Sequence, residues 1–372
     1  MAEDATRAWL ILAAAPGLDG NRLAGLLAGC GGAVQLLRAG ASHWRAAGLP
    51  PNTIAALGAP DEARIAAARA WLGAAADHHL IGVDDPRFPP LLRQASDPPV
   101  ALFVRGDPAT LSVPQLAIVG SRNASPAGME TAHAFARHIA GLGLGITSGL
   151  ALGIDTAAHR GALAADGLTV AVLGTGPDRI YPARNAALGE EIARCGALCS
   201  EFLPGTPPLR ENFPQRNRII SALAAGTLVV EAGLQSGALI TARRAVEQGR
   251  EVFAIPGSIH NPLAKGCHQL IRSGAKLVES AEHILEELAP LLAAAPQAQT
   301  RPGTATAVAD DARLRDPDYR RLLEALGWDT TDADTLALRS GLTSAEVSSM
   351  LLILELEGLV QPLAGGRYQR QR

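Results

Sequence analysis

One set of residues has the types and spacing that suit the binding of phosphate groups. Gly120, Ser121 and Arg122 follow an apolar β-branched run and precede a helical segment. Backbone N–H groups at a helix start attract anions, and a hydroxyl and a guanidinium add donors. Similar glycine-rich strand ends recur along the chain, with the residues Ser148, Gly149, Gly174, Thr175, Gly176, Ser236 and Gly237. Each alone is also typical of a tight turn, but together on one sheet edge they predict an anion pocket.

An arginine-rich segment forms a second set. It carries the side chains of Arg210, Phe213, Arg216, Asn217 and Arg218, directly after a proline-rich loop. Arginine forks hold phosphates through two hydrogen bonds, and an aromatic ring stacks a base at about 1–3 kcal/mol whatever the base. The segment therefore predicts a contact with phosphates and a stacked base. The alternative is a helix start with surface arginines and one core phenylalanine.

Motifs of nucleotide-dependent enzymes are missing from the sequence. No GxxxxGK[ST] loop occurs, and the two lysines, Lys265 and Lys276, follow no suitable glycine loop. The strand end Gly174–Gly176 lacks the third glycine of a dinucleotide fingerprint, since Arg179 stands in its place. These features disfavour an NTPase and a hydride-transfer enzyme.

Groups that could act as an acid or a base are few. Asp155 and His159 are four residues apart and could share one helix face as an acid/base pair, although a structural cap or pair is the favoured interpretation of Asp155. Glu231 ends a strand and could anchor a helix start or a ribose, or act as a base. No nucleophile, base and orienting residue form a set. We therefore expect no enzyme and assign no catalytic residue.

Composition sets further limits. The four cysteines form no CxxC pair, so neither a disulfide framework nor a structural zinc site is expected, and no metal or cofactor is implied. The net charge is −3, so a nucleic-acid partner must meet positive charge that is local. The N-terminal apolar stretch Ala8–Pro16 is far short of the about 20 residues that a bilayer requires, and Glu3 and Asp4 precede it. Membrane insertion and secretion are disfavoured.

Strand–helix alternation places the glycine-rich ends. Between residues 115 and 288, short β-branched runs that end in glycine alternate with helical segments. The first such helix begins with Ser125 as N-cap and Pro126 as its first residue. The alternation predicts an α/β domain whose parallel sheet has helices on both faces and binds ligands beyond the carboxyl ends of its strands. The expected strands are Leu116–Gly120, Leu144–Gly149, Leu168–Gly176, Thr227–Gly233 and Glu251–Gly257.

Four other segments flank this α/β domain. Residues 1–80 show apolar residues at helical spacing, broken by glycine clusters, and predict a small bundle of short helices. Residues 81–114 are rich in proline and predict an extended connector. Residues 289–312 form an Ala/Pro-rich linker. Residues 313–372 predict three helices and a β-ribbon, which together indicate a winged helix.

The third helix of the predicted winged helix, Thr343–Glu357, begins with a capping box of Thr343 and Glu346. It also contains Glu355 and Glu357 but no lysine or arginine. A helix in a major groove normally carries basic or amide side chains. We therefore expect this module to contact mainly protein or a second copy of itself. Its wing arginines could still touch a DNA backbone; they are Arg367, Arg370 and Arg372.

Several segments of the central region occur in an order that is known from one protein family. They are Ala117–Arg122, Ser148–Asp155, His159–Ala162, Val172–Gly176, Tyr181–Pro182 with Asn185, Phe213–Ser221, Ser236–Ala242 and Ala254–Gly257. Together they resemble the DNA-processing protein A family (DprA, also called Smf), densely from about Phe88 to Val278. The N-terminal helices resemble a SAM-like or helix-hairpin-helix module, with Gly48–Pro51 as the candidate hairpin. These helices and the winged module also fit the family's larger members.

The resemblance implies a cytoplasmic bacterial protein that binds incoming single-stranded DNA during natural transformation, protects it and loads the recombinase RecA onto it. It implies an extended Rossmann domain that forms a homodimer, without catalysis. Gly120–Arg122 would be the phosphate-binding turn, and Arg210 and Phe213 the basic and aromatic residues of the DNA-binding groove. Arg184 stands where members often carry a basic residue. Leu152 replaces an arginine of many members, which weakens the case for a phosphate contact there.

Two other functions are alternatives on such a sheet. A nucleotide-modifying enzyme that resembles phosphoribohydrolases would carry a Pro-Gly-Gly-x-Gly-Thr run with a following glutamate, and the comparable strand end, Glu231–Gly237, lacks that run. A duplex-DNA regulator led by the winged helix is disfavoured by the acidic third helix. Binding and loading of single-stranded DNA is the favoured hypothesis.

Overall fold

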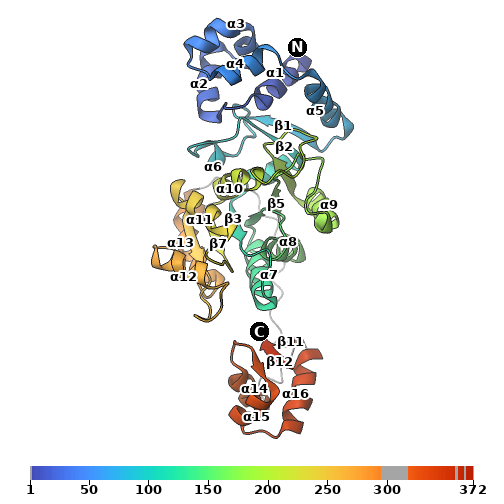
Figure 1. The fold of residues 1–372 in the computed structure, drawn as a ribbon, viewed down its shortest axis with the longest axis vertical. Helices are drawn as coiled ribbons and strands as arrows, with labels where there is room; N and C mark the ends of the chain where they lie inside the picture. Colours follow the sequence, from blue (N-terminus) through green and yellow to red (C-terminus); the bar gives the residue numbers. More distant parts are fainter. Residues whose placement is uncertain (1, 295–316, 357–358, 364–365, 372) are drawn as a thin grey trace. The chain divides into compact units, whose positions relative to one another are not determined.

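The chain folds into two compact units. The computed structural model describes residues 2–294, 317–356, 359–363 and 366–371. The larger unit contains the N-terminal helices and a nine-stranded sheet, and the smaller contains a three-stranded sheet near the C-terminus (Figure 1).

A mixed sheet forms the centre of the larger unit. Its strands are β1 (His78–Gly82), β2 (Ala101–Gly106), β3 (Gln115–Val119), β4 (Gly145–Ser148), β5 (Thr169–Val172), β6 (Ala197–Ser200), β7 (Gly226–Val229), β8 (Glu251–Ala254) and β9 (Lys276–Leu277). Their order is β1-β2-β6-β5-β4-β3-β7-β8-β9. From β6 to β9 every neighbouring pair is parallel, whereas β1 and β2 add an antiparallel extension beside β6. The predicted α/β fold is confirmed. Strands β4 to β6 lie on one side of β3 and strands β7 to β9 on the other, so the strand order changes direction between β3 and β7.

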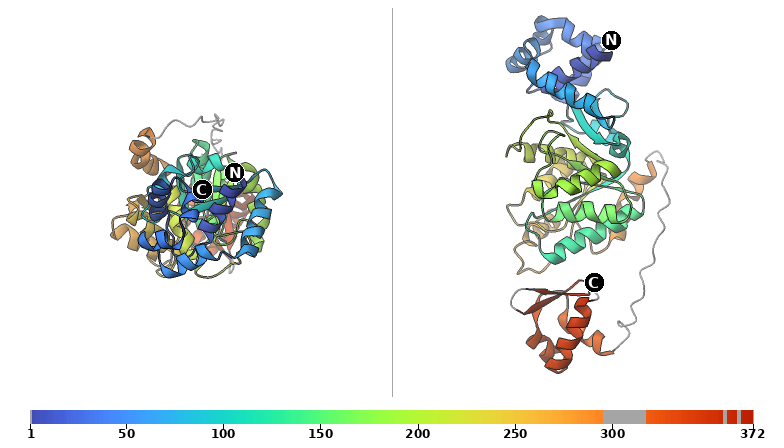
Figure 2. Two further views of the ribbon diagram at one scale, coloured as in Figure 1. Left: turned by 90° about the horizontal axis from the view of Figure 1, so that it is seen from above. Right: turned by 90° about the vertical axis from the view of Figure 1, so that its right-hand side faces the viewer.

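Helices cover both faces of the parallel strands. They are α7 (Pro126–Gly141), α8 (Ile154–Ala164), α9 (Ala186–Cys195), α10 (Asn212–Leu223), α11 (Gly237–Glu247), α12 (Lys265–Arg272) and α13 (Ala281–Ala294). Ile118 on β3 points into the core under α7, α8 and α13, and α9 packs on the same face over β5 and β6. Ala117 and Val119 point the other way, into the core under α10, α11 and α12. Both faces are therefore buried, as expected for parallel strands that are apolar throughout (Figure 2).

The N-terminal helices share one core with the sheet. They are α1 (Ala2–Ala14), α2 (Gly20–Cys30), α3 (Ala33–Ala46), α4 (Pro51–Gly58) and α5 (Glu62–Ala74). Leu10 and Leu23 belong to the same buried cluster as Phe103 of β2. At the boundary, a Cβ on Gly82 would lie 2.5 Å from Cζ2 of Trp9, so the glycine lets the indole pack on β1. The predicted helical bundle is present, and it is joined to the sheet by continuous apolar packing.

The segment 81–114, expected as an extended connector, takes part in the sheet instead. It contains the end of β1, all of β2 and two short helical turns, α6 (Pro90–Arg93) and η1 (Pro108–Ser112). Val104 of β2 pairs with Cys199 of β6, a partner almost one hundred residues away in the chain. Local proline signals dominate the sequence pattern here, and they do not reveal a pairing that is set by distant residues. The candidate hairpin Gly48–Pro51 spans the end of the α3–α4 connection and the first residue of α4.

The smaller unit is a winged helix, as predicted. It contains α14 (Pro317–Leu326), α15 (Ala333–Ser340) and α16 (Ser344–Leu356), with strands β10 (Thr331–Asp332), β11 (Val360–Leu363) and β12 (Arg367–Arg370). The antiparallel sheet has the order β10-β12-β11. The capping box forms, because Thr343 N donates to Glu346 Oε2 at 2.8 Å and Glu346 N donates to Thr343 Oγ1 at 3.3 Å. From residue 295 onward, the predicted linker lies outside the described residues, as do Arg313, Glu357 and Arg372.

No single helix of the described residues is long and apolar enough to cross a membrane. Helices α2 and α3 reach that length only as a pair, across a bend of 95°.

Candidate nucleic-acid interface

The turn after β3 lies where the strand order changes direction, between the neighbouring strands β3 and β7. Ser121 N donates to Glu231 O, which follows β7, at 2.7 Å, and Ile154 N at the start of α8 donates to Ser121 O at 3.2 Å. The Gly120–Arg122 turn is thereby fixed between the end of β7 and a helix N-terminus. Such crevices beyond the carboxyl ends of parallel strands are where open α/β sheets bind ligands.

The loop after β4 is held by a buried carboxylate. Asp155 Oδ2 accepts hydrogen bonds from Gly149 N and Ala151 N, both at 3.2 Å, and the residue is only 6 % exposed. Burial raises the pKa of Asp155, and the positive charge of Arg216 opposes that rise. Among the interpretations of Asp155, the structural one fits these contacts. Ser148 is likewise engaged, because its buried hydroxyl donates to Ile118 O at 2.6 Å.

Arg216 bridges the ends of β4 and β5 through hydrogen bonds to backbone carbonyls. Its Nη1 donates to Gly149 O at 2.7 Å and also to Val172 O, and its Nε donates to Asn217 Oδ1 at 3.0 Å. The residue is 4 % exposed, and burial lowers the pKa of its guanidinium to about 10. The side chain therefore positions the turns after β4 and β5 and places a positive charge beside them.

Phe213, Tyr181 and Arg122 form a cluster beside these turns. The ring centroids of Phe213 and Tyr181 are 5.6 Å apart with an interplanar angle of 44°, and Arg122 Cζ lies 5.7 Å from the Phe213 centroid. Gly174 allows this packing, because a Cβ there would be 2.8 Å from Phe213 Cδ1. Tyr181 is 46 % exposed and was not among the predicted site residues. Its signal in the sequence is an aromatic residue in a loop that directly follows a strand end.

The remaining predicted residues divide into buried and exposed ones. Thr175 is buried and donates to Arg179 O at 2.5 Å, and Gly176 N donates to Thr206 O at 3.0 Å, so both hold the loop after β5. Ser236 is the N-cap of α11, where Ala238 N donates to its hydroxyl at 3.3 Å, and Gly237 is exposed. The exposed arginines that form no ion pair with any described residue include Arg122, Arg184 and Arg210.

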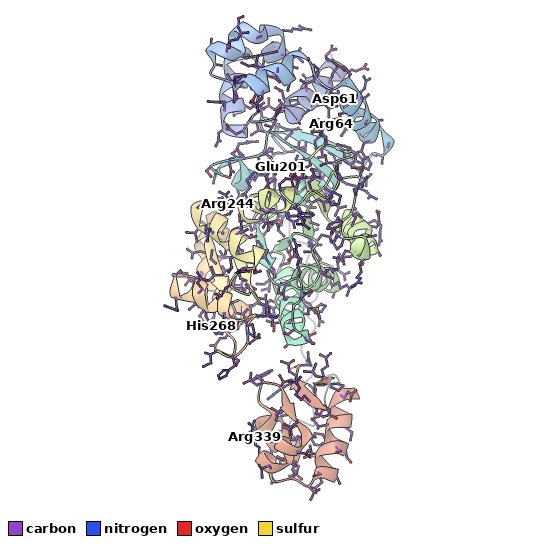
Figure 3. All side chains as sticks on the ribbon, viewed as in Figure 1. Asp61, Arg64, Glu201, Arg244, His268 and Arg339 are labelled. Carbon is purple, nitrogen blue, oxygen red and sulfur yellow. The ribbon has the colours of Figure 1, made fainter. Side chains whose placement is uncertain are left out.

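Arg218 faces a different part of the molecule. Its Nη2 donates to Glu201 Oε2, and its Nε lies 3.4 Å from Asp97 Oδ2. The Arg218 side chain is 12 % exposed, and it lines a hollow between the N-terminal helices and the sheet. Its partner Glu201 is labelled in Figure 3. The structure thus separates Arg216 and Arg218 although they are two residues apart. The pattern Arg216, Ile219, Ile220 and Leu223 has helical spacing and could have revealed that Arg216 lies on the apolar face.

The predicted alternative of an acid/base pair lacks support in the geometry. His159 is fully buried, its Nδ1 lies 2.7 Å from Thr169 Oγ1, and burial lowers its pKa to about 3, so the ring is neutral. Asp155 is engaged by backbone N–H groups. Within the described ranges, no group of three or more His, Cys, Asp or Glu side chains could hold a metal ion.

Comparison with known proteins identifies two family matches. Residues 79–289 match the family described as DNA recombination-mediator protein A, and residues 294–366 match the DprA winged helix domain. Protein Smf of Escherichia coli is 46 % identical over 297 residues, which cover 80 % of this chain and 78 % of that protein. DNA processing protein DprA of Streptococcus pneumoniae is 49 % identical over 205 residues, covering 55 % and 72 %.

Solved structures give the same relationship. The X-ray structure of DprA from Streptococcus pneumoniae matches with a TM-score of 0.65 and 37 % identity, covering 75 % of this chain and 95 % of that one. A structure of DprA from Helicobacter pylori, described for its single-stranded DNA binding mode, matches with a TM-score of 0.51 and 30 % identity, covering 55 % and 93 %.

Proposed function

We propose that this chain, which belongs to the DNA recombination-mediator protein A family, binds single-stranded DNA at the sheet edge formed by the turns after β3, β4 and β5. Its role is to protect incoming DNA in natural transformation in the cytoplasm and to load the recombinase RecA onto it. The single-stranded DNA binding described for DprA from Helicobacter pylori supports this ligand. The function requires binding and no catalysis.

The observation that carries the proposal is the cluster of Arg122, Phe213 and Tyr181. An exposed guanidinium, with no acidic partner among the described residues, lies beside two aromatic rings in tilted contact and a helix N-terminus. Arginine and backbone N–H groups bind phosphate, and aromatic rings stack bases of any identity. These are the two components of sequence-tolerant single-strand binding.

The remaining site residues take different parts in the proposal. Arg184 and Arg210 contact the backbone of the strand, and Ser121 and Gly237 offer donors at helix starts. Arg216 positions the loops from below and meets no phosphate, because its guanidinium is bonded to backbone carbonyls. Arg218 lies with Glu201 and Asp97 and is left out of the DNA contact.

Self-association through the Rossmann-like domain is part of the proposal. Helix α11 exposes Ile240 and Val246, and the loop before it exposes Leu234. β9, the last strand of the sheet, exposes Leu277. Exposed apolar side chains beside an open sheet edge support a contact with a second copy.

The acidic α16 supports a protein contact for the winged helix.

The test is binding of labelled oligo(dT) and of matched duplex across a salt series, followed by fluorescence anisotropy. Each phosphate contact contributes about −0.7 to the slope of log K against log[salt] on single strands. We expect Arg122→Ala and Arg210→Ala each to weaken binding and to flatten the slope by about that amount. The control is Arg194→Ala, an exposed arginine in the last turn of α9, which lies before the start of β6 and therefore away from the carboxyl ends of the strands. Absence of single-strand binding at low salt overturns the proposal.

A further inference from the structure

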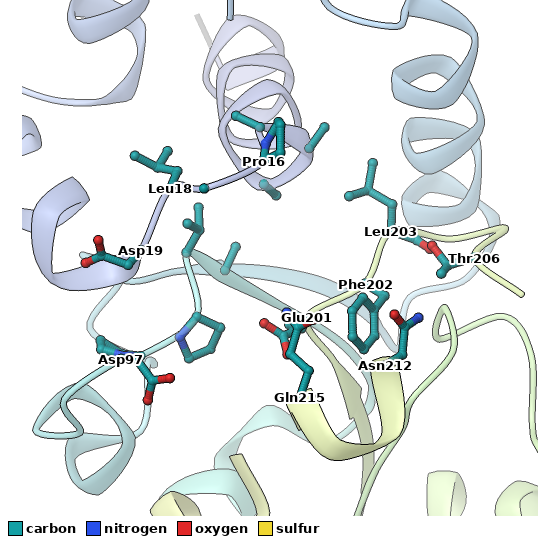
Figure 4. A pocket seen from close by; sticks show the side chains of 18 of the residues that line it. Pro16, Leu18, Asp19, Asp97, Glu201, Phe202, Leu203, Thr206, Asn212 and Gln215 are labelled. Carbon is teal, nitrogen blue, oxygen red and sulfur yellow. The ribbon is translucent and has the colours of Figure 1, made fainter. Parts of the chain in front are cut away.

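The hollow that Arg218 faces is a pocket with a cavity volume of about 540 Å³. It is enclosed by the α1–α2 turn, the segment that leads into β2, the loop after β6 and one side of α10 (Figure 4). We call it the acidic pocket. Its polar lining includes Asp19, Asp97, Glu201, Gln215 and Arg218.

The charges in the acidic pocket do not balance. Three carboxylates line it, those of Asp19, Asp97 and Glu201, whereas the guanidinium groups are those of Arg218 and Arg64. Arg218 is already engaged by two of the carboxylates, and Arg64 is exposed on α5. The difference leaves one net negative charge inside a partly closed space. Phosphate-bearing ligands are disfavoured there, because their charge has the same sign.

One carboxylate oxygen in the acidic pocket lacks a donor. The Glu201 side chain is 10 % exposed, and its Oε1 makes no hydrogen bond of ordinary geometry with any described residue, although the Gln215 amide lies beside the carboxyl group. A buried acceptor without a donor is destabilising, so a ligand that brings N–H donors would be stabilised there. Asp97 is 45 % exposed and can be reached from solvent.

The walls between these carboxylates include apolar side chains. Leu18, Pro98, Pro99, Phe202 and Leu203 line the space. An arginine side chain pairs a planar fork of N–H donors with an apolar stem that packs along such surfaces. A lysine ammonium brings fewer directed donors to a carboxylate.

From these observations we propose that the acidic pocket is a docking site for an arginine side chain presented by an extended segment of a protein partner. The guanidinium lies between Asp97 and Asp19 and donates toward Glu201, and the aliphatic stem packs on Phe202 and the two prolines. The site is separate from the DNA-binding edge, since it uses the opposite side of α10.

The test uses the full chain and two small probes, N-acetyl-arginine amide and its neutral isostere N-acetyl-citrulline amide. Binding is followed by NMR chemical shifts of backbone amides around Glu201 and Gln215. We expect the arginine probe to bind at least about fivefold more tightly than the citrulline probe. Asp19→Asn and Asp97→Asn should each weaken the arginine probe by about two- to fivefold. Asparagine remains a good N-cap for α2 at position 19, so this variant preserves the fold.

The control variant is Glu191→Gln, which removes an exposed carboxylate from α9, outside the acidic pocket. It should leave binding of the arginine probe unchanged. Equal affinities of the two probes overturn the proposal, as does an unchanged affinity in both asparagine variants. Tighter binding of deoxyguanosine monophosphate than of the arginine probe at the same amides also overturns it, in favour of a nucleotide site. None of these outcomes depends on DNA binding at the sheet edge.

Discussion

Replacement of Arg216 by methionine tests whether this buried guanidinium supports the strand ends. Methionine fills a similar apolar volume, but it removes the donors to Gly149 O and Val172 O and the positive charge near Asp155. Loss of one partner of a buried ionic arrangement costs about 3–5 kcal/mol. A domain has about 5–15 kcal/mol of stability in total. We therefore expect Arg216→Met to fold with a much reduced free energy of unfolding.

The pH dependence gives this prediction a second readout. Burial raises the pKa of Asp155 in the folded state above its unfolded value. Folding thus disfavours the charged form, so Asp155 lowers stability at neutral pH, and this penalty disappears as pH falls below the unfolded pKa. Without Arg216 the folded pKa rises further and the penalty at neutral pH grows. The stability deficit of Arg216→Met relative to wild type should therefore be larger at pH 7 than at pH 4.5.

The assay is urea denaturation at both pH values, followed by circular dichroism and by tryptophan fluorescence. Trp44 and Trp9 report on the unit that contains Arg216, because the N-terminal helices share its core. Arg194→Met is the matched control, an exposed arginine for which we expect a change within about 0.5 kcal/mol. A loss below about 1 kcal/mol in Arg216→Met, or a deficit that is equal at both pH values, would refute the reasoning.

Three further predictions follow from the described contacts. Gly174→Ala places a Cβ against the Phe213 ring and should weaken oligo(dT) binding by about 1 kcal/mol, measured by anisotropy; unchanged affinity would show that the ring position is unimportant. Tyr181→Ala should weaken binding by about 1–3 kcal/mol while Tyr181→Phe stays near wild type, and equal losses in 2-aminopurine fluorescence titrations would argue against stacking. Cys195 is exposed, whereas burial raises the pKa of the Cys199 thiol to about 12. Iodoacetamide should therefore modify Cys195 well before Cys199 in the native protein, and mass spectrometry that finds the reverse order would contradict the burial.

The parts of the fold that sequence predicts well are those with local signals. Ser125 and Pro126 mark the start of α7, and Gly128 N indeed donates to Ser125 Oγ at 3.0 Å. The strand before it, β3, ends at Val119, directly before the glycine that the pattern already shows. Strands β1, β2 and β6 were not predicted, although β1 and β2 also end in glycine. Their antiparallel pairing joins residues that are distant in the chain, and the short apolar run Ala197–Ser200 is separated from the preceding helix only by Gly196.

The candidate site divides in the same way. Sequence reasoning assigns Arg122 and Phe213 to one nucleic-acid site, and in the structure Arg122 Cζ lies 5.7 Å from the centroid of the Phe213 ring. The density of arginines in this segment does not distinguish Arg216 from Arg218, but residues two apart on a helix lie about 200° apart around its axis and therefore face different sides. Tyr181 joins the cluster through a loop whose path depends on packing against Phe213, and no local pattern fixes that path.

The packing of Trp9 on Gly82 also constrains how this chain can change over evolution. The indole occupies the space that any side chain at position 82 would need. A larger residue at 82 is acceptable only after position 9 has become small or helix α1 has been lost, and the loss of α1 would in turn free position 82 to vary. The two positions should therefore covary among relatives. A glycine at this position of β1 would then indicate that a relative also has the N-terminal helices.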